Sequence, residues 1–324
     1  MSKIKLGIIG FGYMGSTHAG IFAKDSRVEI KSVFDVKPER NELAARNFGA
    51  NVCENATQIF DTCDAVIITA PNKTHPQYAI AAANAGKHVL CEKPMATSLA
   101  EAKEILEAAA NSKAVFQVGH NRRFAPVYVT LKELIATDAP FAAHIKMNRG
   151  ELQNPVWTGD KNITGGFLYE TPIHLFDMMR FQFGEISELS ALGSSKTYDE
   201  VDNFSLLVKF ANGFHATFAT SAAASWLFPF ERIEVFGEHR SIVTQEMENL
   251  QDSKGFDANF QTLSWHQLAK EERWGYVQED AAFVNAILDE TEPPVTAYDG
   301  YKSVELVEAV YQSVKTGETI KFDS

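Results

Sequence analysis

The chain has 324 residues and is 45% hydrophobic, which is long and apolar enough for two domains that each bury a core. Its formal net charge of −12 is spread along the sequence, so nucleic acid and anionic membrane surfaces are not expected as partners. No apolar run approaches the roughly 18 residues of a membrane span, and residues 1–10 lead into glycines rather than a cleavage site.

The cysteines indicate the redox compartment of the protein. Cys53, Cys63 and Cys91 are an odd number and show no CxxC spacing. This usage fits buried, reduced thiols better than a disulfide framework or a zinc site. We therefore expect a cytoplasmic protein without a bound metal ion.

Strands and helices alternate in the first half of the sequence. Short apolar runs that end at glycine or a polar residue predict buried parallel strands at 4–9, 28–34, 65–69, 88–91 and 115–118. Helical patterns lie between them, after the first strand and at 77–85 and 99–111. This alternation predicts an α/β Rossmann domain with a doubly wound parallel sheet, covering residues 1–119.

The turn between the first strand and its helix carries the motif GxGxxG. In this context the first glycine permits a tight turn, the second lets a pyrophosphate approach the backbone, and the third lets helix and strand pack closely. The phosphates would lie at the helix N-terminus. The expected cofactor-binding residues of the turn are Gly10, Phe11, Gly12, Tyr13, Met14 and Gly15.

An aspartate at the end of the second predicted strand bears on the choice of cofactor. Asp35 follows the glycine motif by about 20 residues, where a carboxylate can bind the ribose hydroxyls. The alternative is a glycine turn with an unrelated, solvated aspartate. A carboxylate here repels a 2′-phosphate and therefore favours NAD. The nearby positive charges of Lys37 and Arg40 weaken this preference, so NADP is also considered as a cofactor.

The second half of the sequence has a different pattern. Successive strands are predicted at 186–192, 203–210, 215–221 and 232–236, after a first one at 141–147. Strands without intervening helices predict an open, mainly antiparallel sheet in an α+β domain covering 120–324. Helices are expected at 125–136, 172–183, 278–288 and 300–315, the last packing back on the first domain. Because such a sheet needs cover on its second face, we expect a homodimer or homotetramer.

Two places in the sequence offer chemistry. Glu170 and His174 lie four residues apart at the entry to the predicted helix 172–183, and a neighbouring carboxylate can orient a histidine for base work near neutral pH. The plainer alternative is a helix cap with a structural histidine. Lys93 leaves the carboxyl end of a strand, where doubly wound sheets bind ligands, and could hold a reacting oxygen. Its alternative is a solvated lysine beside Glu92.

Several motifs together resemble one family. They are GFGYMG, APNKTH, CEKPM, QVGHNRRF, TGGFLYETPIH and the closing DGYKSVELVEAVYQSVKTGE. In this combination, over essentially the whole length, the chain resembles the glucose-fructose oxidoreductase and inositol dehydrogenase (Gfo/Idh/MocA) family.

The resemblance implies roles for particular residues. Lys93 would bind the reacting hydroxyl, often with a cis bond before Pro94, and His174 would be the acid/base with Glu170 beside it. The other implied positions are Pro71, Asn72, His75 and Glu92 near the cofactor, and Asn121 and Arg123 near the substrate pocket. The family usually has aspartate at position 170 and glycine at position 164, where this chain has Glu170 and Thr164. The extra methylene of Glu170 puts inositol itself in doubt as the substrate.

Three functions compete at this point. The first is an NAD(P)-dependent oxidoreductase that moves hydride between nicotinamide and a secondary alcohol or ketone of a sugar or polyol. The second is a sensor that binds dinucleotide or sugar without turnover, and the third is a glycosidase with retained NAD. The presence of both Lys93 and His174 favours an enzyme over the sensor, because a binding protein has no need of a matched base and cation.

Overall fold

The computed structural model describes residues 3–150, 156–225, 230–256 and 260–322. The chain forms two compact units, residues 1–120 with 276–304, and residues 121–275 with 305–324. The first unit thus includes a late segment of the sequence. Among the described residues no helix has both the length and the apolar character needed to cross a lipid bilayer.

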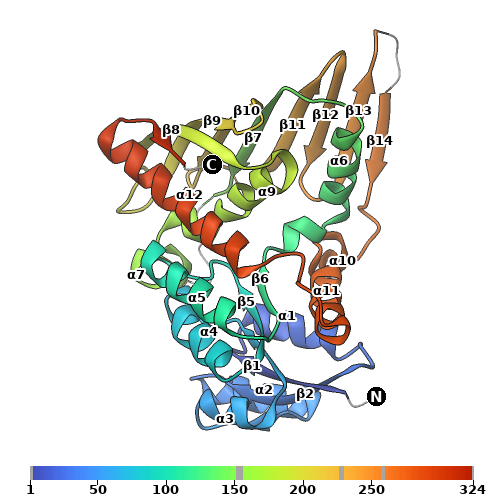
Figure 1. Cartoon of the computed structure of the whole chain (residues 1–324), viewed down its shortest axis with the longest axis vertical. Coiled ribbons are helices and arrows are strands. Elements are labelled where there is room, and N and C mark those ends of the chain that lie inside the picture. Colours follow the sequence, from blue (N-terminus) through green and yellow to red (C-terminus); the bar gives the residue numbers. More distant parts are fainter. Residues whose placement is uncertain (1–2, 151–155, 226–229, 257–259, 323–324) are drawn as a thin grey trace. The chain divides into compact units, whose positions relative to one another are not determined.

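The first unit is built on a six-stranded sheet in the order β3-β2-β1-β4-β5-β6 (Figure 1). Every neighbouring pair of strands in it is parallel. This is the Rossmann strand order, so the predicted fold of the first half is confirmed. The strands are β1 (Ile4–Ile9), β2 (Val28–Phe34), β3 (Asn51–Val52), β4 (Ala65–Ile68), β5 (His88–Glu92) and β6 (Phe116–Gly119).

Helices cover both faces of this sheet. Leu6 of β1 packs in one cluster with Phe22 and Phe283. Gly7 points to the opposite face, where a Cβ would lie 2.1 Å from Ile59. Because β1 is buried on both faces from Leu6 to Ile9, its sequence there is apolar at successive positions rather than alternating, and only Lys5 near its start is charged and exposed. The helices are α1 (Tyr13–Phe22), α2 (Pro38–Phe48), α3 (Thr57–Thr62), η1 (Asn72–Thr74), α4 (His75–Asn84), α5 (Leu99–Asn111) and α11 (Tyr276–Asp289).

The second unit contains a nine-stranded sheet in the order β14-β13-β12-β11-β7-β10-β9-β8-β15. Its pairs are antiparallel except for β7 with β10, so the prediction of a mainly antiparallel sheet is confirmed. The strands are β7 (Ala142–Asn148), β8 (Ile186–Ser194), β9 (Asn203–Phe210), β10 (His215–Ser221), β11 (Glu231–Gly237), β12 (Arg240–Gln245), β13 (Asn249–Lys254), β14 (Phe260–Ser264) and β15 (Ile320–Lys321).

One face of the nine-stranded sheet carries helices and forms the core of the second unit (Figure 1). Phe176 of α9 meets Phe218 of β10 edge to face, with ring centroids 5.4 Å apart. On the other face, Leu192 and Leu207 are 77% and 66% exposed. The remaining elements are η2 (Asn121–Phe124), α6 (Pro126–Ala136), η3 (Val156–Gly159), α7 (Lys161–Thr164), α8 (Phe167–Glu170), α9 (Ile173–Phe183), α10 (Lys270–Arg273) and α12 (Ala297–Thr316), which begins in the first unit.

Several elements were not predicted. Helix α2 has the usual end signals, with Pro38 in its first turn and a left-handed Gly49 after it, but a weakly apolar face. All five residues of β14 are exposed, so this strand has no alternation of apolar and polar residues to reveal it. The predicted strands and helices were otherwise found within a few residues of their expected bounds.

A buried ion pair fixes the start of the second unit. Arg122 of η2 donates from Nε to both oxygens of Glu231, at 3.0 Å each, and from Nη2 to Oε2 at 2.8 Å. The Tyr128 hydroxyl also donates to Glu231. The two charged side chains are 5% and 0% exposed, so each needs the other as a partner in place of water.

We predict that Arg122→Met destabilises the protein by about 3–5 kcal/mol, because it leaves the Glu231 carboxylate buried and unpaired. Arg27→Met is the matched control, since the ion pair of Arg27 with Asp25 lies at the surface and contributes about 0–1 kcal/mol. Urea denaturation followed by circular dichroism measures both. Equal losses in the two variants would contradict the role given to burial.

Candidate functional site

The candidate cofactor site lies along one edge of the six-stranded sheet. Parallel strands all deliver their carboxyl ends to the same edge, and ligands bind there where the strand order reverses, here between β1 and β4. The glycine turn follows β1, Asp35 follows β2, and Lys93 follows β5. The fold therefore gathers residues that are far apart in the sequence.

The glycine turn has no space for side chains at its critical positions. Gly10 has φ +90°, and a Cβ there would lie 2.6 Å from the Ala70 nitrogen. A Cβ on Gly15 would lie 2.1 Å from the Gly10 oxygen. Helix α1 starts directly after Gly12, whose position as N-cap brings no side-chain hydrogen bond to the helix. The close packing and the uncapped helix start fit a pyrophosphate bound against the backbone.

The other residues of the turn divide between core and surface. Phe11 is buried and meets Phe48 edge to face, with ring centroids 6.1 Å apart. Tyr13 is 67% exposed, and Met14 is half-buried. The Phe11 ring thus belongs to the core, and its backbone nitrogen donates to Asp35.

Asp35 is buried and holds the turn in place. Its Oδ2 accepts from the Phe11 nitrogen at 2.7 Å, and its Oδ1 accepts from the Lys37 nitrogen at 2.8 Å. Arg40 Nη1 lies 3.3 Å from Oδ2 and 3.5 Å from the position of a Cβ on Gly12. The carboxylate and a guanidinium thus both lie beside the glycine turn.

The Lys93 turn is held from two sides. The Lys93 nitrogen donates to Glu92 Oε2 at 3.0 Å, and the bond from Lys93 to Pro94 is cis, as the resemblance implied. Buried His75 lies with Nδ1 2.7 Å from the Pro94 oxygen and Nε2 2.7 Å from the Ala70 oxygen. Burial lowers the pKa of His75, against the opposing effect of these two carbonyls. Its ring therefore ties the Lys93 turn to the segment that follows β4.

The segment after β4 contains the other two implied cofactor positions. Pro71 is exposed and precedes η1, while Asn72, the first residue of η1, is buried. Both belong to the same edge of the sheet as the glycine turn, because β4 is the neighbour of β1.

Glu170 and His174 lie on either side of a break between two helices in the second unit. Gly165 and Gly166, both with positive φ, end α7 and begin the short helix α8, whose last residue is Glu170. His174 is in the first turn of α9 and is 8% exposed, with its backbone nitrogen 3.4 Å from the Thr171 oxygen. The helix predicted at 172–183 is therefore present as α9. Glu170 lies just before it and His174 lies in its first turn.

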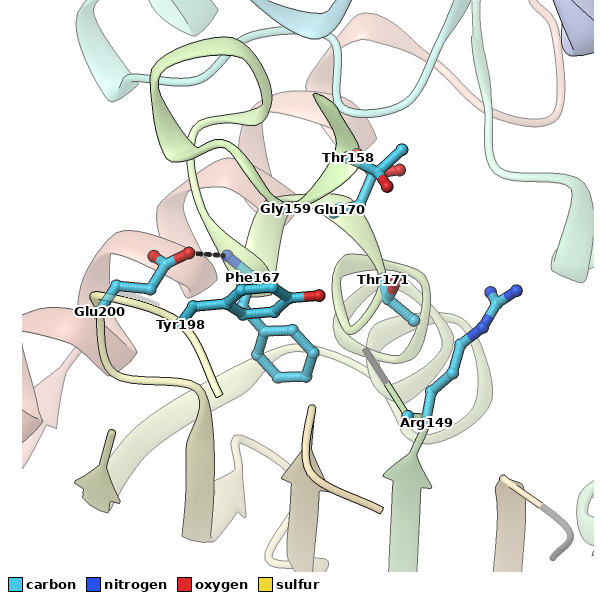
Figure 2. A pocket seen from close by; sticks show the side chains of 9 residues that line it. Arg149, Thr158, Gly159, Phe167, Glu170, Thr171, Tyr198 and Glu200 are labelled. Atoms are coloured by element: carbon cyan, nitrogen blue, oxygen red, sulfur yellow. Dashed lines mark hydrogen bonds between the residues drawn. The ribbon is translucent and has the colours of Figure 1, made fainter. Parts of the chain in front are cut away.

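A small hollow lies beside Glu170, with room for about one water molecule (Figure 2). The Phe167 nitrogen donates to Glu200 Oε1 at 3.1 Å, and burial raises the pKa of that carboxyl. Figure 2 shows the Tyr198 ring next to Phe167. The lining residues are Arg149, Gly150, Thr158, Gly159, Phe167, Glu170, Thr171, Tyr198 and Glu200.

Sequence reasoning missed most of this lining. Arg149 follows β7 and Thr158 belongs to η3, and neither carries a motif that would have marked it. Tyr198 and Glu200 come from the connection between β8 and β9. Only tertiary structure brings these side chains together with Glu170.

The two residues expected near the substrate pocket have protein partners. Asn121 Nδ2 donates to the Trp274 oxygen at 2.8 Å. Arg123 donates to Asp177 through Nε at 2.8 Å and Nη2 at 2.6 Å, a bidentate pair with a carboxylate that is fully buried. These contacts give both side chains a positioning role within the second unit.

We predict that Gly15→Ala destabilises the protein by about 1–3 kcal/mol and removes most of its dinucleotide affinity, because the new methyl group overlaps the Gly10 carbonyl. Gly20→Ala is the matched control on the same helix. No atom lies within 4 Å of a Cβ there, so it should stabilise α1 by about 0.5–1 kcal/mol. Thermal unfolding and calorimetric titration with NAD measure both effects. Undiminished affinity in Gly15→Ala would contradict this geometry.

Comparison with known proteins places these features in a family. A family profile described as "Oxidoreductase family, NAD-binding Rossmann fold" matches residues 4–120, and its companion, "Oxidoreductase family, C-terminal alpha/beta domain", matches residues 132–322. The "Myo-inositol 2-dehydrogenase" of Thermotoga maritima is 25% identical over 99% of each chain. The "Uncharacterized oxidoreductase YrbE" of Bacillus subtilis is 27% identical over 99% of this chain and 97% of its own.

The solved structures agree with the fold. "Levoglucosan dehydrogenase, complex with NADH and levoglucosan" superposes with a TM-score of 0.90 at 25% identity, covering 100% of both chains. The family match shows that the first unit is an NAD-binding Rossmann domain, and the close-packed glycine turn agrees with this. The chain belongs to the Gfo/Idh/MocA family of NAD-binding oxidoreductases.

Proposed function

We propose that the chain is an NAD-dependent dehydrogenase that oxidises a secondary alcohol of a sugar or polyol, or reduces the matching ketone. The observation that carries this proposal is the place of Lys93, at the carboxyl edge of the same sheet as the glycine turn and Asp35. A cation beside a nicotinamide site suits a reaction in which negative charge develops on oxygen.

The proposed roles follow from the chemistry of each side chain. The Lys93 ammonium donates a hydrogen bond to the reacting hydroxyl and stabilises the developing alkoxide. The His174 imidazole takes the hydroxyl proton, and Glu170 holds a neighbouring hydroxyl. When bound, NAD supplies the acceptor for the hydride that leaves the carbinol carbon. In the opposite direction the imidazolium of His174 returns the proton to the carbonyl oxygen.

The substrate class rests on the relatives and on the pocket. The relatives named for inositol and levoglucosan act on polyhydroxylated rings, as their names state. The hollow beside Glu170 is too small in this structure to enclose a sugar ring, but it presents carboxylate, hydroxyl and guanidinium groups from Glu170, Thr158 and Arg149. Such groups match several hydroxyls of one ring better than an apolar alcohol.

The expectations about assembly and location are part of the same proposal. The open face of the nine-stranded sheet exposes Leu192 and Leu207, which favours association with a second copy. We therefore propose a homodimer or homotetramer in the cytoplasm.

We predict that Lys93→Met lowers kcat by about 10²–10³-fold and leaves NAD affinity nearly unchanged, because the lysine acts on the hydroxyl oxygen. The assay follows reduced nicotinamide absorbance with NAD and NADP, each offered inositols, aldoses, amino sugars and their keto forms. Lys103→Met, at an exposed position of α5, is the matched control and should behave as wild type.

Turnover that also vanishes in His174→Ala would establish the dehydrogenase and its substrate class. Near-normal rates in Lys93→Met would overturn the site assignment. Absence of turnover on every member, with NAD binding confirmed, would favour a sensor or a glycosidase with retained cofactor.

We predict that Asp35→Ala weakens NAD binding by roughly tenfold or more and strengthens binding of NADP relative to NAD. The substitution removes a charged acceptor at the ribose and leaves the Arg40 guanidinium available to a 2′-phosphate. Calorimetric titration with both cofactors measures the ratio. In Asp35→Ala/Arg40→Ala the gain for NADP should disappear, and unchanged affinities in the single variant would refute the ribose role.

A further inference from the structure

A buried histidine links the helix after the glycine turn to the Lys93 turn. His18, in the second turn of α1, is 0% exposed. Its Nε2 lies 3.1 Å from Glu92 Oε1, and its Nδ1 lies 2.7 Å from Asp280 Oδ1 on α11. All three residues belong to the first unit, and the two contacts join segments that are 74 and 262 residues apart in sequence.

The partners determine the charge of this ring. A carboxylate only accepts hydrogen bonds, and a neutral imidazole has one N–H and one lone pair. Burial raises the pKa of Asp280 to about 6, and His18 lowers the pKa of Glu92 against the effect of burial. Between two carboxylates at these distances, His18 donates from both nitrogens as an imidazolium. The Asp280 and Glu92 charges accordingly raise the pKa of His18, although burial opposes them.

The same arrangement argues against a metal ion at this place. Ligand atoms of His18, Glu279 and Asp280 lie within 4.8 Å of one another, which is close enough to suggest a metal site. However, both ring nitrogens of His18 lie at hydrogen-bond distance from carboxylate oxygens. An imidazolium has no lone pair to give to a metal, so the cluster is better described as an ion network.

The Glu92 carboxylate connects His18 to Lys93. One carboxylate oxygen, Oε1, faces His18, while the other, Oε2, accepts the Lys93 backbone N–H at 3.0 Å. Gly119 of β6 closes the far side, since a Cβ there would lie 3.0 Å from Glu92 Oε2. The Glu92 carboxylate is thus held by the His18 ring on α1 and by the Lys93 backbone nitrogen, and the lack of a side chain at Gly119 leaves it the space it occupies.

We propose that His18 is a positioning residue for Lys93, acting through Glu92, and that it couples the helix of the glycine turn to the lysine that binds the hydroxyl. The inference rests on the proposed role of Lys93 and deepens it. Burying an ion network is a poor route to stability, because apolar side chains of similar volume usually serve as well. Holding one geometry at a reacting group is a use that apolar packing does not provide.

The test compares two substitutions of His18 that each keep one half of the imidazole. Gln places an amide near the position of Nε2 and can still donate to Glu92. Asn places its amide near the position of Nδ1, so it keeps only the Asp280 contact. If the link to Glu92 matters, His18→Asn should lower kcat by about 100-fold, and His18→Gln by less than about tenfold. NAD affinity should change by less than about threefold in both.

A second readout does not depend on turnover. Hydrogen exchange of the Lys93 amide, measured by mass spectrometry with residue-resolved fragmentation, reports directly on its bond to Glu92. We expect about tenfold faster exchange at Lys93 in His18→Asn and little change in His18→Gln. His88→Asn is the control on the same strand, β5, and should alter neither kcat nor the exchange of the Lys93 amide. Thermal unfolding of all variants separates local from global effects.

Glu92→Gln is the alternative variant for the exchange measurement if His18→Asn does not fold. The amide of Gln replaces one of the two carboxylate oxygens with a donor, so the side chain no longer accepts both at the position facing His18 and at the position facing the Lys93 nitrogen. Faster exchange at Lys93 is again expected, because the charged His18 attracts the one remaining oxygen. Equal effects of His18→Asn and His18→Gln on Lys93 exchange, or no effect of His18→Asn in a folded protein, would overturn the inference. Exchange that changes as expected, without turnover on any sugar, would support the positioning role and count against the proposed dehydrogenase.

Discussion

The site depends on the parallel direction of the six strands of the first unit. A parallel sheet collects the carboxyl ends of all its strands along one edge, so whatever residues follow those strands become neighbours. Here they are a glycine turn, the Asp35 carboxylate and the Glu92-Lys93-Pro94 turn. Each is encoded locally, by a residue type placed just after an apolar run, and no long-range pattern in the sequence is needed to bring them together. The helices and cores on both faces serve to keep this edge in register.

The same reasoning explains what could be predicted from the sequence. Strand Ala65–Ile68 and the Leu6–Ile9 part of the first strand are buried on both faces and therefore stand out as continuous apolar runs. Strand Phe260–Ser264 is exposed at every residue, so its sequence has no apolar run or alternation that would predict a strand. The glycine motif and Asp35 were found because their spacing is set within one βαβ unit. The contact of His18 with Asp280 could not be predicted, because it joins residues 262 positions apart and no local sequence pattern indicates it.

Charge is buried in both units, and each unit has one buried charge network close to residues given a role in the chemistry. The His18 network lies next to Lys93, and the bidentate pair of Arg123 with Asp177 lies on α9, which begins near His174. Ionic groups in a protein interior tolerate few arrangements, because each donor must meet its acceptor and no water can substitute. Apolar cores of the kind formed by Leu6, Phe22 and Phe283 tolerate more variation. The buried charge networks therefore mainly fix a geometry, whereas the apolar cores mainly stabilise the fold.

The first unit is completed by residues 276–304, which include α11 with Phe283 in the core and Asp280 on His18. A ribosome makes these residues after almost all of the second unit. Until they emerge, the nascent dinucleotide-binding unit lacks one wall of its core and one partner of a buried imidazolium. The order of synthesis thus makes the final fold of residues 1–120 wait for residues 276–304, while the intervening residues 121–275 are already available to fold.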